Sequence, residues 1–177
     1  MTKRSLPEKI VALHAALGSV PHAFGGAIAL AYYAEPRATI DIDLNVFVPE
    51  QRATKIAALL TPLGVSGTLA HVERDGQVRL WWDDTPVDLF FSYDRFHDAA
   101  AKVVRVVPFA DTTIPILSAD HLVVCKAVFD RPKDWVDIDA MEDADSDLDA
   151  AEILRWVGRI CGDTDPRYNR IAAVLLG

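Results

Sequence analysis

The chain of 177 residues carries 51% hydrophobic and 25% charged residues and a formal net charge of −8 at pH 7. This composition excludes an intrinsically disordered chain, and the length allows a core that folds without disulfides or a structural metal ion. The negative charge argues against a broad electrostatic surface for nucleic acid, so any contact with a polynucleotide must be local.

Helices and strands alternate in the first part of the chain. Ser5 and Glu8 form a capping box for the first helix, and the run from Asp41 to Val46 alternates between polar and apolar residues as strands do. The predicted elements are a helix over 5–17, a strand over 21–24, a helix over 27–33, a strand over 39–48 and a helix over 50–60.

The middle of the chain predicts an antiparallel meander, and the last third predicts helices. Turn residues at Asp75-Gly76 and Asp83-Asp84 separate the three strands of the meander. The predicted elements are strands over 68–73, 78–82 and 86–91, a helix over 93–101, a strand over 103–107, a helix over 118–129, and further helices with an acidic interruption over 137–149.

The uncharged segment over 10–34 is long enough for a membrane span, but four glycine and proline residues interrupt it. We therefore expect no membrane insertion. The capping box also argues against a signal peptide, so we expect the mature protein to start near Met1. Cys125 and Cys161 lack the neighbours of a disulfide framework or zinc site, and we expect a cytoplasmic location.

Three aspartates on predicted strands form the candidate chemical site. Asp41 and Asp43 stand two residues apart, so alternation directs both carboxylates to one face, with Cα atoms about 7 Å apart. Asp88 lies on another strand between apolar residues. Carboxylates in this arrangement suit two Mg²⁺ ions that hold a triphosphate for in-line displacement.

Each of these features also has a purely structural interpretation. Asp41 and Asp43 could line a solvated strand face. Gly25-Gly26, which would let a phosphate approach the backbone before a helix, could form only a tight turn. Arg37 would place a cation beside the same site, or it could be a surface residue of a loop.

Taken together, the motifs resemble the DNA polymerase beta-like nucleotidyltransferase superfamily. The resemblance rests on Phe24-Gly25-Gly26-Ala27, on Arg37-x-Thr39-x-Asp41-Ile42-Asp43-Leu44 and on Val87-Asp88-Leu89. The spacing is most similar to the small bacterial members, which are the AbiEii and MenT-type toxins and the lincosamide and aminoglycoside nucleotidyltransferases. Lys126 and the run Lys133-Asp134-x-x-Asp137-Ile138 resemble the helical half of those members.

The resemblance implies a role for each matching residue. Gly25 and Gly26 would form the phosphate loop, although the serine that the family often has there is absent. Asp41 and Asp43 would bind metal, and Asp88 would be a third metal ligand or the general base. The resemblance also implies that Lys126 and Arg37 reach the triphosphate and that Asp134 orients the acceptor or Lys126. Lys133 and Asp134 could equally form a helix-surface pair.

We therefore expect an α+β minimal nucleotidyltransferase fold. It would have a mixed, twisted sheet flanked by helices, with a catalytic core over 1–114 and a helical C-terminal subdomain over 115–177. The implied enzyme is a Mg²⁺-dependent nucleotidyltransferase that transfers a nucleoside monophosphate from a nucleoside triphosphate, ATP among the candidates, to an acceptor hydroxyl.

The acceptor stays open at this stage. The small size favours a toxin of a toxin-antitoxin system that acts on tRNA or protein and has a cognate antitoxin as partner. The acidic chain favours a small cationic drug. A third alternative is a nucleotide-binding or partner-binding protein that keeps the fold without catalysis.

Two further expectations concern charge. A tRNA acceptor would need a local basic strip. The available cations for such a strip are Lys3, Arg4, Lys9, Arg52, Lys55, Lys102 and Arg105. The acidic run over 137–149 has no EF-hand spacing, so we expect it to form a solvated helix face and loop.

Overall fold

The computed structural model describes residues 3–70, 76–144 and 147–177. The chain forms two compact units. The first comprises Met1–Ile28 and Ala38–Ile116, and the second comprises Ala29–Arg37 and Leu117–Gly177. The short helix α2 (Gly26–Leu30) carries the chain from the first unit into the second.

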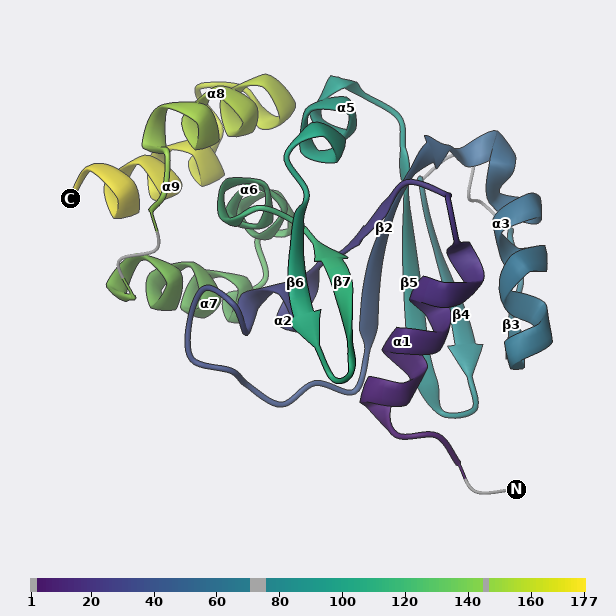
Figure 1. The fold of residues 1–177 in the computed structure, drawn as a ribbon. Helices are drawn as coiled ribbons and strands as arrows, with labels where there is room; N and C mark the ends of the chain where they lie inside the picture. The colour runs from purple at the N-terminus through teal and green to yellow at the C-terminus, as the bar shows by residue number, and fades with distance from the viewer. Residues whose placement is uncertain (1–2, 71–75, 145–146) are drawn as a thin grey trace. The chain divides into compact units, whose positions relative to one another are not determined.

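A mixed sheet organises the first unit (Figure 1). Its described residues form seven strands in the order β3-β4-β5-β2-β1-β7-β6. β2 pairs in parallel with β5 and antiparallel with β1, so the centre of the sheet combines both kinds of pairing. The strands are β1 (His22–Phe24), β2 (Ile42–Pro49), β3 (Val65–Ser66), β4 (Gln77–Trp82), β5 (Thr85–Ser92), β6 (Arg105–Phe109) and β7 (Thr112–Ile116).

Helices complete this unit, and α1 and α3 contact each other. The Lys9 ammonium of α1 lies over the ring of Trp82. α1 therefore packs on the face of the sheet to which the Trp82 side chain points. The helical elements are α1 (Leu6–Leu17), the 3-10 turns η1 (Glu50–Arg52) and η2 (Thr61–Leu63), α3 (Ala53–Leu60) and α5 (Arg95–Lys102).

The central strands bury one face completely. Ile42 and Leu44 on β2 and Val87 and Leu89 on β5 have no exposed surface. Because successive side chains of a strand point to opposite faces, the residues between them lie on the other face of the sheet. The apolar core therefore determines the face of the sheet on which Asp43 and Asp88 lie.

The second unit is helical in its C-terminal part. α6 (Ala119–Phe129) packs against α7 (Pro132–Asp143), α8 (Ala150–Cys161) and α9 (Pro166–Leu176). Trp135 of α7 is buried, and the guanidinium of Arg170 on α9 lies 4.1 Å from its ring centroid. No described helix combines the length and the apolar composition that a membrane span requires.

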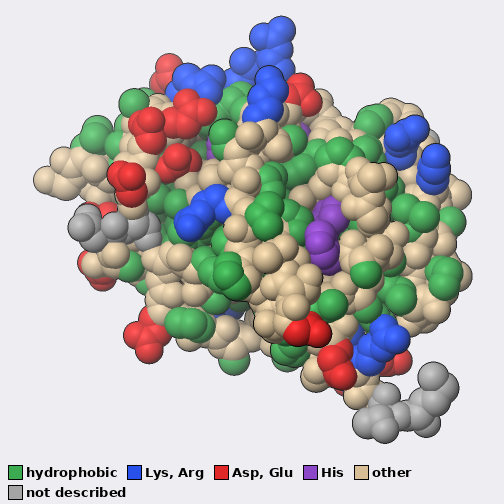
Figure 2. Space-filling model, in the orientation of Figure 1, with side chains coloured by type: hydrophobic (Ala, Val, Ile, Leu, Met, Phe, Trp, Pro, Cys, Tyr) green, Lys and Arg blue, Asp and Glu red, His purple; other side chains and the backbone are tan. Residues whose placement is uncertain are grey.

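Charges of both signs are mixed on the surface. Figure 2 shows Lys and Arg side chains interspersed with Asp and Glu side chains on the visible face. A broad basic surface is thus absent from the described residues of this face, as the net charge of −8 leads one to expect.

The α+β fold class expected from the sequence is confirmed, and most predicted elements are present within a few residues. Two strands are exceptions. The predicted strand over 68–73 is irregular at 67–69, and its residues 71–73 lie outside the described residues; the strand that pairs with β4 is instead Val65–Ser66. The second exception is β7, which the sequence patterns did not predict and which pairs with β6. β6 continues through Pro108, because an edge strand tolerates a residue without a backbone N–H.

The expectation for the acidic run was also wrong at its start. Asp137 lies within α7 and is only 3% exposed. The helix turns Asp137 inward together with Trp135, Ile138 and Met141, whereas Asp139 stays on the solvated side. Burial of Asp137 is possible because cations meet its carboxylate, as described below.

Candidate active site

Asp41 and Asp43 lie at the start of the central strand β2. Asp41 directly precedes the strand, and its carboxylate accepts a hydrogen bond from the Thr39 hydroxyl. Both aspartates are half-buried, and they alternate with the fully buried Ile42 and Leu44. Strand alternation therefore directs both carboxylates to the face opposite the apolar core, as the spacing predicts.

Asp88 lies beside Asp43 on the neighbouring strand. Asp43 and Asp88 are direct partners in the parallel pairing of β2 with β5, and Asp88 is 2% exposed. Directly paired residues share one face of a sheet, with strands about 4.8 Å apart. The structure therefore brings together all three aspartates of the predicted site on one face of the first unit.

A glycine turn packs directly against Asp43. The Gly25 N–H donates to the Asp43 carbonyl oxygen at 2.9 Å. Gly26 has a φ of +52°, and a Cβ added there would lie 1.8 Å from Oδ2 of Asp43. Only glycine fits this position, since any larger residue would be strained and would collide with the carboxylate.

Arg79, which the sequence analysis did not single out, completes the group. It lies on β4 as the direct partner of Asp88. Its Nε donates to Oδ1 of Asp88 at 2.8 Å, and Nη2 donates to Oδ2 at 2.6 Å. The alternation of polar and apolar residues along β4 predicts the exposed position of Arg79. Its pairing with Asp88 depends in addition on the register between β4 and β5.

The electrostatics of this group reflect three carboxylates and one guanidinium. The hydrogen bonds to Asp88 raise the pKa of Arg79 above its ordinary value despite partial desolvation, and the charges of Asp88, Asp41 and Asp43 raise it further. The donor set consists of hard carboxylate oxygens, the ligands that Mg²⁺ prefers. In the described part of the chain, however, no three His, Cys, Asp or Glu side chains are already arranged to hold a metal ion.

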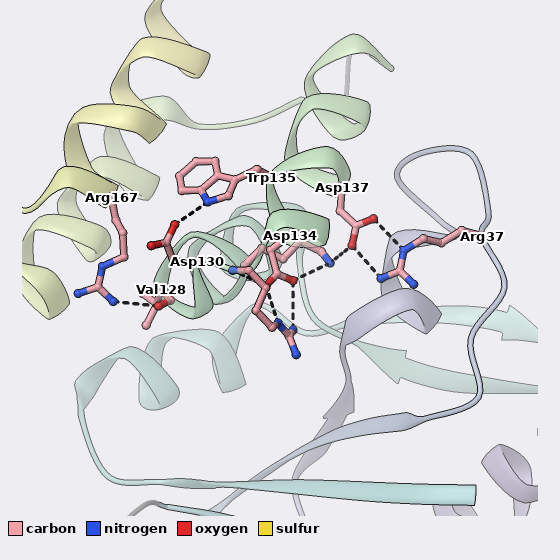
Figure 3. A network of polar contacts seen from close by, with 9 residues as sticks. Arg37, Val128, Asp130, Asp134, Trp135, Asp137 and Arg167 are labelled. Atoms are coloured by element: carbon pink, nitrogen blue, oxygen red, sulfur yellow. Dashed lines mark hydrogen bonds and ion pairs between the residues drawn. The ribbon is translucent and has the colours of Figure 1, made fainter.

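The remaining predicted polar residues meet in the second unit (Figure 3). Asp137 accepts a bidentate pair from Arg37, at 2.8 Å from Nε and 2.9 Å from Nη2. Oδ2 of the same carboxylate accepts from the buried Lys126 ammonium at 2.6 Å. Burial would raise the pKa of Asp137, but the hydrogen bonds from Arg37 and Lys126 hold it below its ordinary value.

Asp134 extends this network. Its carboxylate accepts from Nε of Arg131 at 2.7 Å, and it lies 4.0 Å from the Lys126 ammonium. Asp134 is 1% exposed, so it is not half of a helix-surface pair, whereas Lys133 is exposed. Binding of phosphate by Lys126 and Arg37 stays a prediction, and in this structure both cations pair with Asp137.

Solved structures with a similar fold are nucleotidyltransferases or resemble them. The solution structure of the antibiotic-resistance factor ANT(2'')-Ia is 18% identical, with a TM-score of 0.60 over 95% of this chain and 94% of that chain. A crystal structure of ANT(2'')-Ia with adenylyl-2''-tobramycin is also 18% identical, with a TM-score of 0.59 over 86% and 95%. An antigenic nucleotidyltransferase-like protein from Paracoccidioides brasiliensis is 14% identical, with a TM-score of 0.54 over 97% and 87%.

At these identities the structural likeness establishes the fold alone. No protein with a curated description matches the sequence significantly. The model of one family, described as nucleotidyl transferase AbiEii toxin of type IV toxin-antitoxin systems, matches residues 10–174. The match covers both the carboxylate strands and the helical network, and the chain therefore belongs to the AbiEii nucleotidyltransferase family.

Proposed function

We propose that the protein transfers a nucleoside monophosphate from a nucleoside triphosphate to an acceptor hydroxyl in a Mg²⁺-dependent reaction. One observation carries the proposal, namely that Asp43 and Asp88 are direct strand partners while the turn at Gly26 packs against the Asp43 carboxylate. A phosphate-binding turn beside paired carboxylates is what transfer of a nucleotidyl group requires.

The carboxylates of Asp41, Asp43 and Asp88 would hold the metal ions. The family resemblance implies that two metal ions take part in the reaction. When bound, Mg²⁺ neutralises charge on the phosphates and on the oxygens that attack and leave. Thr39 orients the Asp41 carboxylate through its hydrogen bond. The absence of a Cβ at Gly26 lets the turn lie against the Asp43 carboxylate, so a phosphate held by metal ions on this carboxylate would also lie close to the turn.

Asp88 has a second possible role in the same reaction. As a buried carboxylate beside Asp43, it could accept the proton of the acceptor hydroxyl instead of ligating metal. Both roles require that its oxygens become available, and in this structure Arg79 occupies them.

For the acceptor we propose a hydroxyl of tRNA, with a cognate antitoxin as the partner of the protein. The family match to a type IV toxin supports the toxin role and the antitoxin. The exposed cations Arg52 and Lys55 support the tRNA acceptor, because they offer a local contact for its phosphates. A cationic small molecule is the second candidate, because the net charge of −8 would attract it and because ANT(2'')-Ia, with a similar fold, was solved with adenylyl-2''-tobramycin.

The test incubates the protein with Mg²⁺, each labelled nucleoside triphosphate in turn, and one of three acceptor samples, which are total RNA, tobramycin and total cell extract. We expect label in RNA from one of the nucleotides, and about a 100-fold or greater loss of transfer in Asp43→Asn, since asparagine lacks the negative charge that would hold Mg²⁺ and stabilise the transition state. Asp139→Asn is the matched control, because it removes an exposed carboxylate from α7.

Each outcome separates one interpretation from the others. Label in tobramycin alone would replace the tRNA proposal with the small-molecule alternative. Absence of label in RNA, drug and total extract with all nucleotides would favour a protein that keeps the fold without catalysis. Equal transfer by Asp43→Asn and Asp139→Asn would overturn the assigned site.

A further inference from the structure

Arg79 meets the third carboxylate from a neighbouring strand. Arg79 and Asp88 are direct partners in the β4-β5 hairpin, and Nε and Nη2 of Arg79 each donate to a different carboxylate oxygen, at 2.8 Å and 2.6 Å. This bidentate geometry is the strongest form of arginine-carboxylate pair. It uses both oxygens of Asp88, the same oxygens that a metal ion or an acceptor proton would need.

The two partners differ in exposure. The Asp88 side chain is 3% exposed, whereas the Arg79 side chain is 52% exposed. A buried carboxylate without a partner is strongly destabilising, so Asp88 needs a cation in the absence of metal. The exposed arginine can supply that cation, and its guanidinium can return to solvent once a metal ion takes its place at Asp88.

The other two aspartates act on the same guanidinium. Asp43 is the direct partner of Asp88 on the opposite side from Arg79, so the three residues form one row across β2, β5 and β4. The charges of Asp41 and Asp43 also stabilise the charged form of Arg79. A single arginine thus offsets the repulsion within the acidic group.

We propose that Arg79 is the resident counter-ion of Asp88 and competes with a divalent cation for this carboxylate. The inference rests on the proposed function, because it takes the metal site to include Asp88. The acidic group then alternates between an arginine-held form, which is the structure described above, and a metal-held form in which Arg79 has released Asp88. Arg79 acts in this scheme as a positioning residue for the third carboxylate.

The test measures Mn²⁺ binding to the full chain by electron paramagnetic resonance, without nucleotide. It compares the wild type with Arg79→Gln and with Arg52→Gln, which removes the same charge from an exposed position on η1. We expect Arg79→Gln to bind Mn²⁺ about fivefold more tightly, since each competing ion pair shifts an affinity by about this factor. Arg52→Gln should stay close to the wild type, because distant surface charges are screened.

A measurement on the wild type covers the case in which Arg79→Gln folds poorly. The Nε–H signal of Arg79 in ¹⁵N NMR spectra should shift when Mg²⁺ is added, because the guanidinium leaves Asp88. Equal Mn²⁺ affinities of Arg79→Gln and Arg52→Gln, or an Arg79 signal that stays in place at saturating Mg²⁺, would overturn the competition.

Asp43→Asn separates this inference from the proposed function. If Asp43→Asn binds Mn²⁺ as tightly as the wild type, the cation binds elsewhere, and the proposed metal site fails together with the competition. If Asp43→Asn weakens binding while Arg79→Gln leaves the affinity unchanged, the metal site stands and the competition alone is wrong.

Discussion

Substitution of Gly26 by alanine tests whether the glycine turn serves catalysis or is only a tight turn. A Cβ at residue 26 would lie 1.8 Å from the Asp43 carboxylate, so Gly26→Ala must displace that side chain. We expect transfer to fall about 100-fold or more, because displacement of a catalytic group by about 1 Å has an effect of this size. The measurement is the initial rate of nucleotide transfer.

Gly18→Ala is the control for backbone strain. Gly18 has a φ of +55°, close to the +52° of Gly26, but an added Cβ there meets no atom within 4 Å. Both variants should lose about 1 kcal/mol or more in the free energy of unfolding because of the positive φ. The loss should be greater in Gly18→Ala, because the ψ of Gly18 is −117°, outside the left-handed helical region. Equal losses of transfer in the two variants would show that the glycine turn has only a structural role.

Local spacing made the carboxylates of the site predictable. The Asp-x-Asp pattern lies in a strictly alternating strand, so the shared face of Asp41 and Asp43 follows from the sequence. Arg79 could not be predicted in the same way. Its contact with Asp88 depends on the register of β4 against β5, which the two-residue turn at Asp83 and Asp84 sets. The predicted strands over 78–82 and 86–91 leave three residues in this turn, which would give a different register.

At the scale of elements, α7 anchors the helical unit through a buried carboxylate. Asp137→Asn would leave Lys126, which is 3% exposed, without its closest charged partner and would weaken the pair with Arg37. We expect a loss of about 3 kcal/mol in the free energy of unfolding, as is usual when one member of a buried ion pair is removed. Urea denaturation measures this loss.

Asp139→Asn provides the comparison on the same helix. Asp139 is exposed, so its substitution should change the free energy of unfolding by about 0.5 kcal/mol or less. A loss in Asp137→Asn no greater than that in Asp139→Asn would mean that the cations find other partners.

A second element-scale contact links α1 to β1 through two histidines. His22 Nδ1 bonds the Val20 carbonyl oxygen at 2.6 Å, so this nitrogen carries a proton, and Nε2 of neutral His22 can accept from His14 Nδ1 at 2.8 Å. Burial lowers the pKa of His22 below its ordinary value. Protonation would turn Nε2 of His22 into a donor, so the contact would then require the other tautomer of His14, in which Nδ1 accepts.

The sign of the resulting pH dependence follows from linkage. Burial also lowers the pKa values of His97 and His121, so the unfolded chain binds more protons than the folded chain below about pH 6.5. The free energy of unfolding should therefore rise as the pH increases toward this value. Urea titrations at pH 5.5 and 7.5 should show this rise, with a smaller difference in His22→Gln. A stability that is independent of pH in this range would contradict the assignment.

Elements with complete local signals were predicted well, and those that depend on distant partners were not. α1 has a capping box and a terminal glycine, and both are present in the structure. β7 has no such signal: Thr112 and Thr113 pair with β6, and the pairing of β7 with the distant strand β1 is through Ile116 and Phe24. The inward position of Asp137 likewise depends on Arg37, which lies 100 positions earlier in the sequence.

At the scale of the whole molecule, the net charge of −8 limits how the chain can bind RNA. The proposed strip loses one member, because Lys9 is 1% exposed and donates hydrogen bonds to the Trp82 carbonyl and the Thr85 hydroxyl. Arg52 and Lys55 are exposed on η1 and α3, so they stay available for contact with phosphates.

Reversing these two charges tests whether RNA binds there. For wild-type protein, the logarithm of the RNA affinity should fall linearly with the logarithm of the salt concentration, by about 0.7 to 0.9 for each phosphate contact. In Arg52→Glu/Lys55→Glu the slope should become shallower by about 1.4 to 1.8, because two contacts are lost. Fluorescence anisotropy with labelled tRNA at several salt concentrations measures both slopes.

The matched control is Arg95→Glu/Arg159→Glu, which changes the net charge by the same amount at exposed positions on α5 and α8. Its slope should equal that of the wild type if RNA contacts the Arg52 and Lys55 region specifically. Equal effects of the two double variants would show that only the net charge matters. A wild-type affinity that does not change with salt would contradict binding of the tRNA through a basic strip, because release of counterions from the phosphates must accompany such binding.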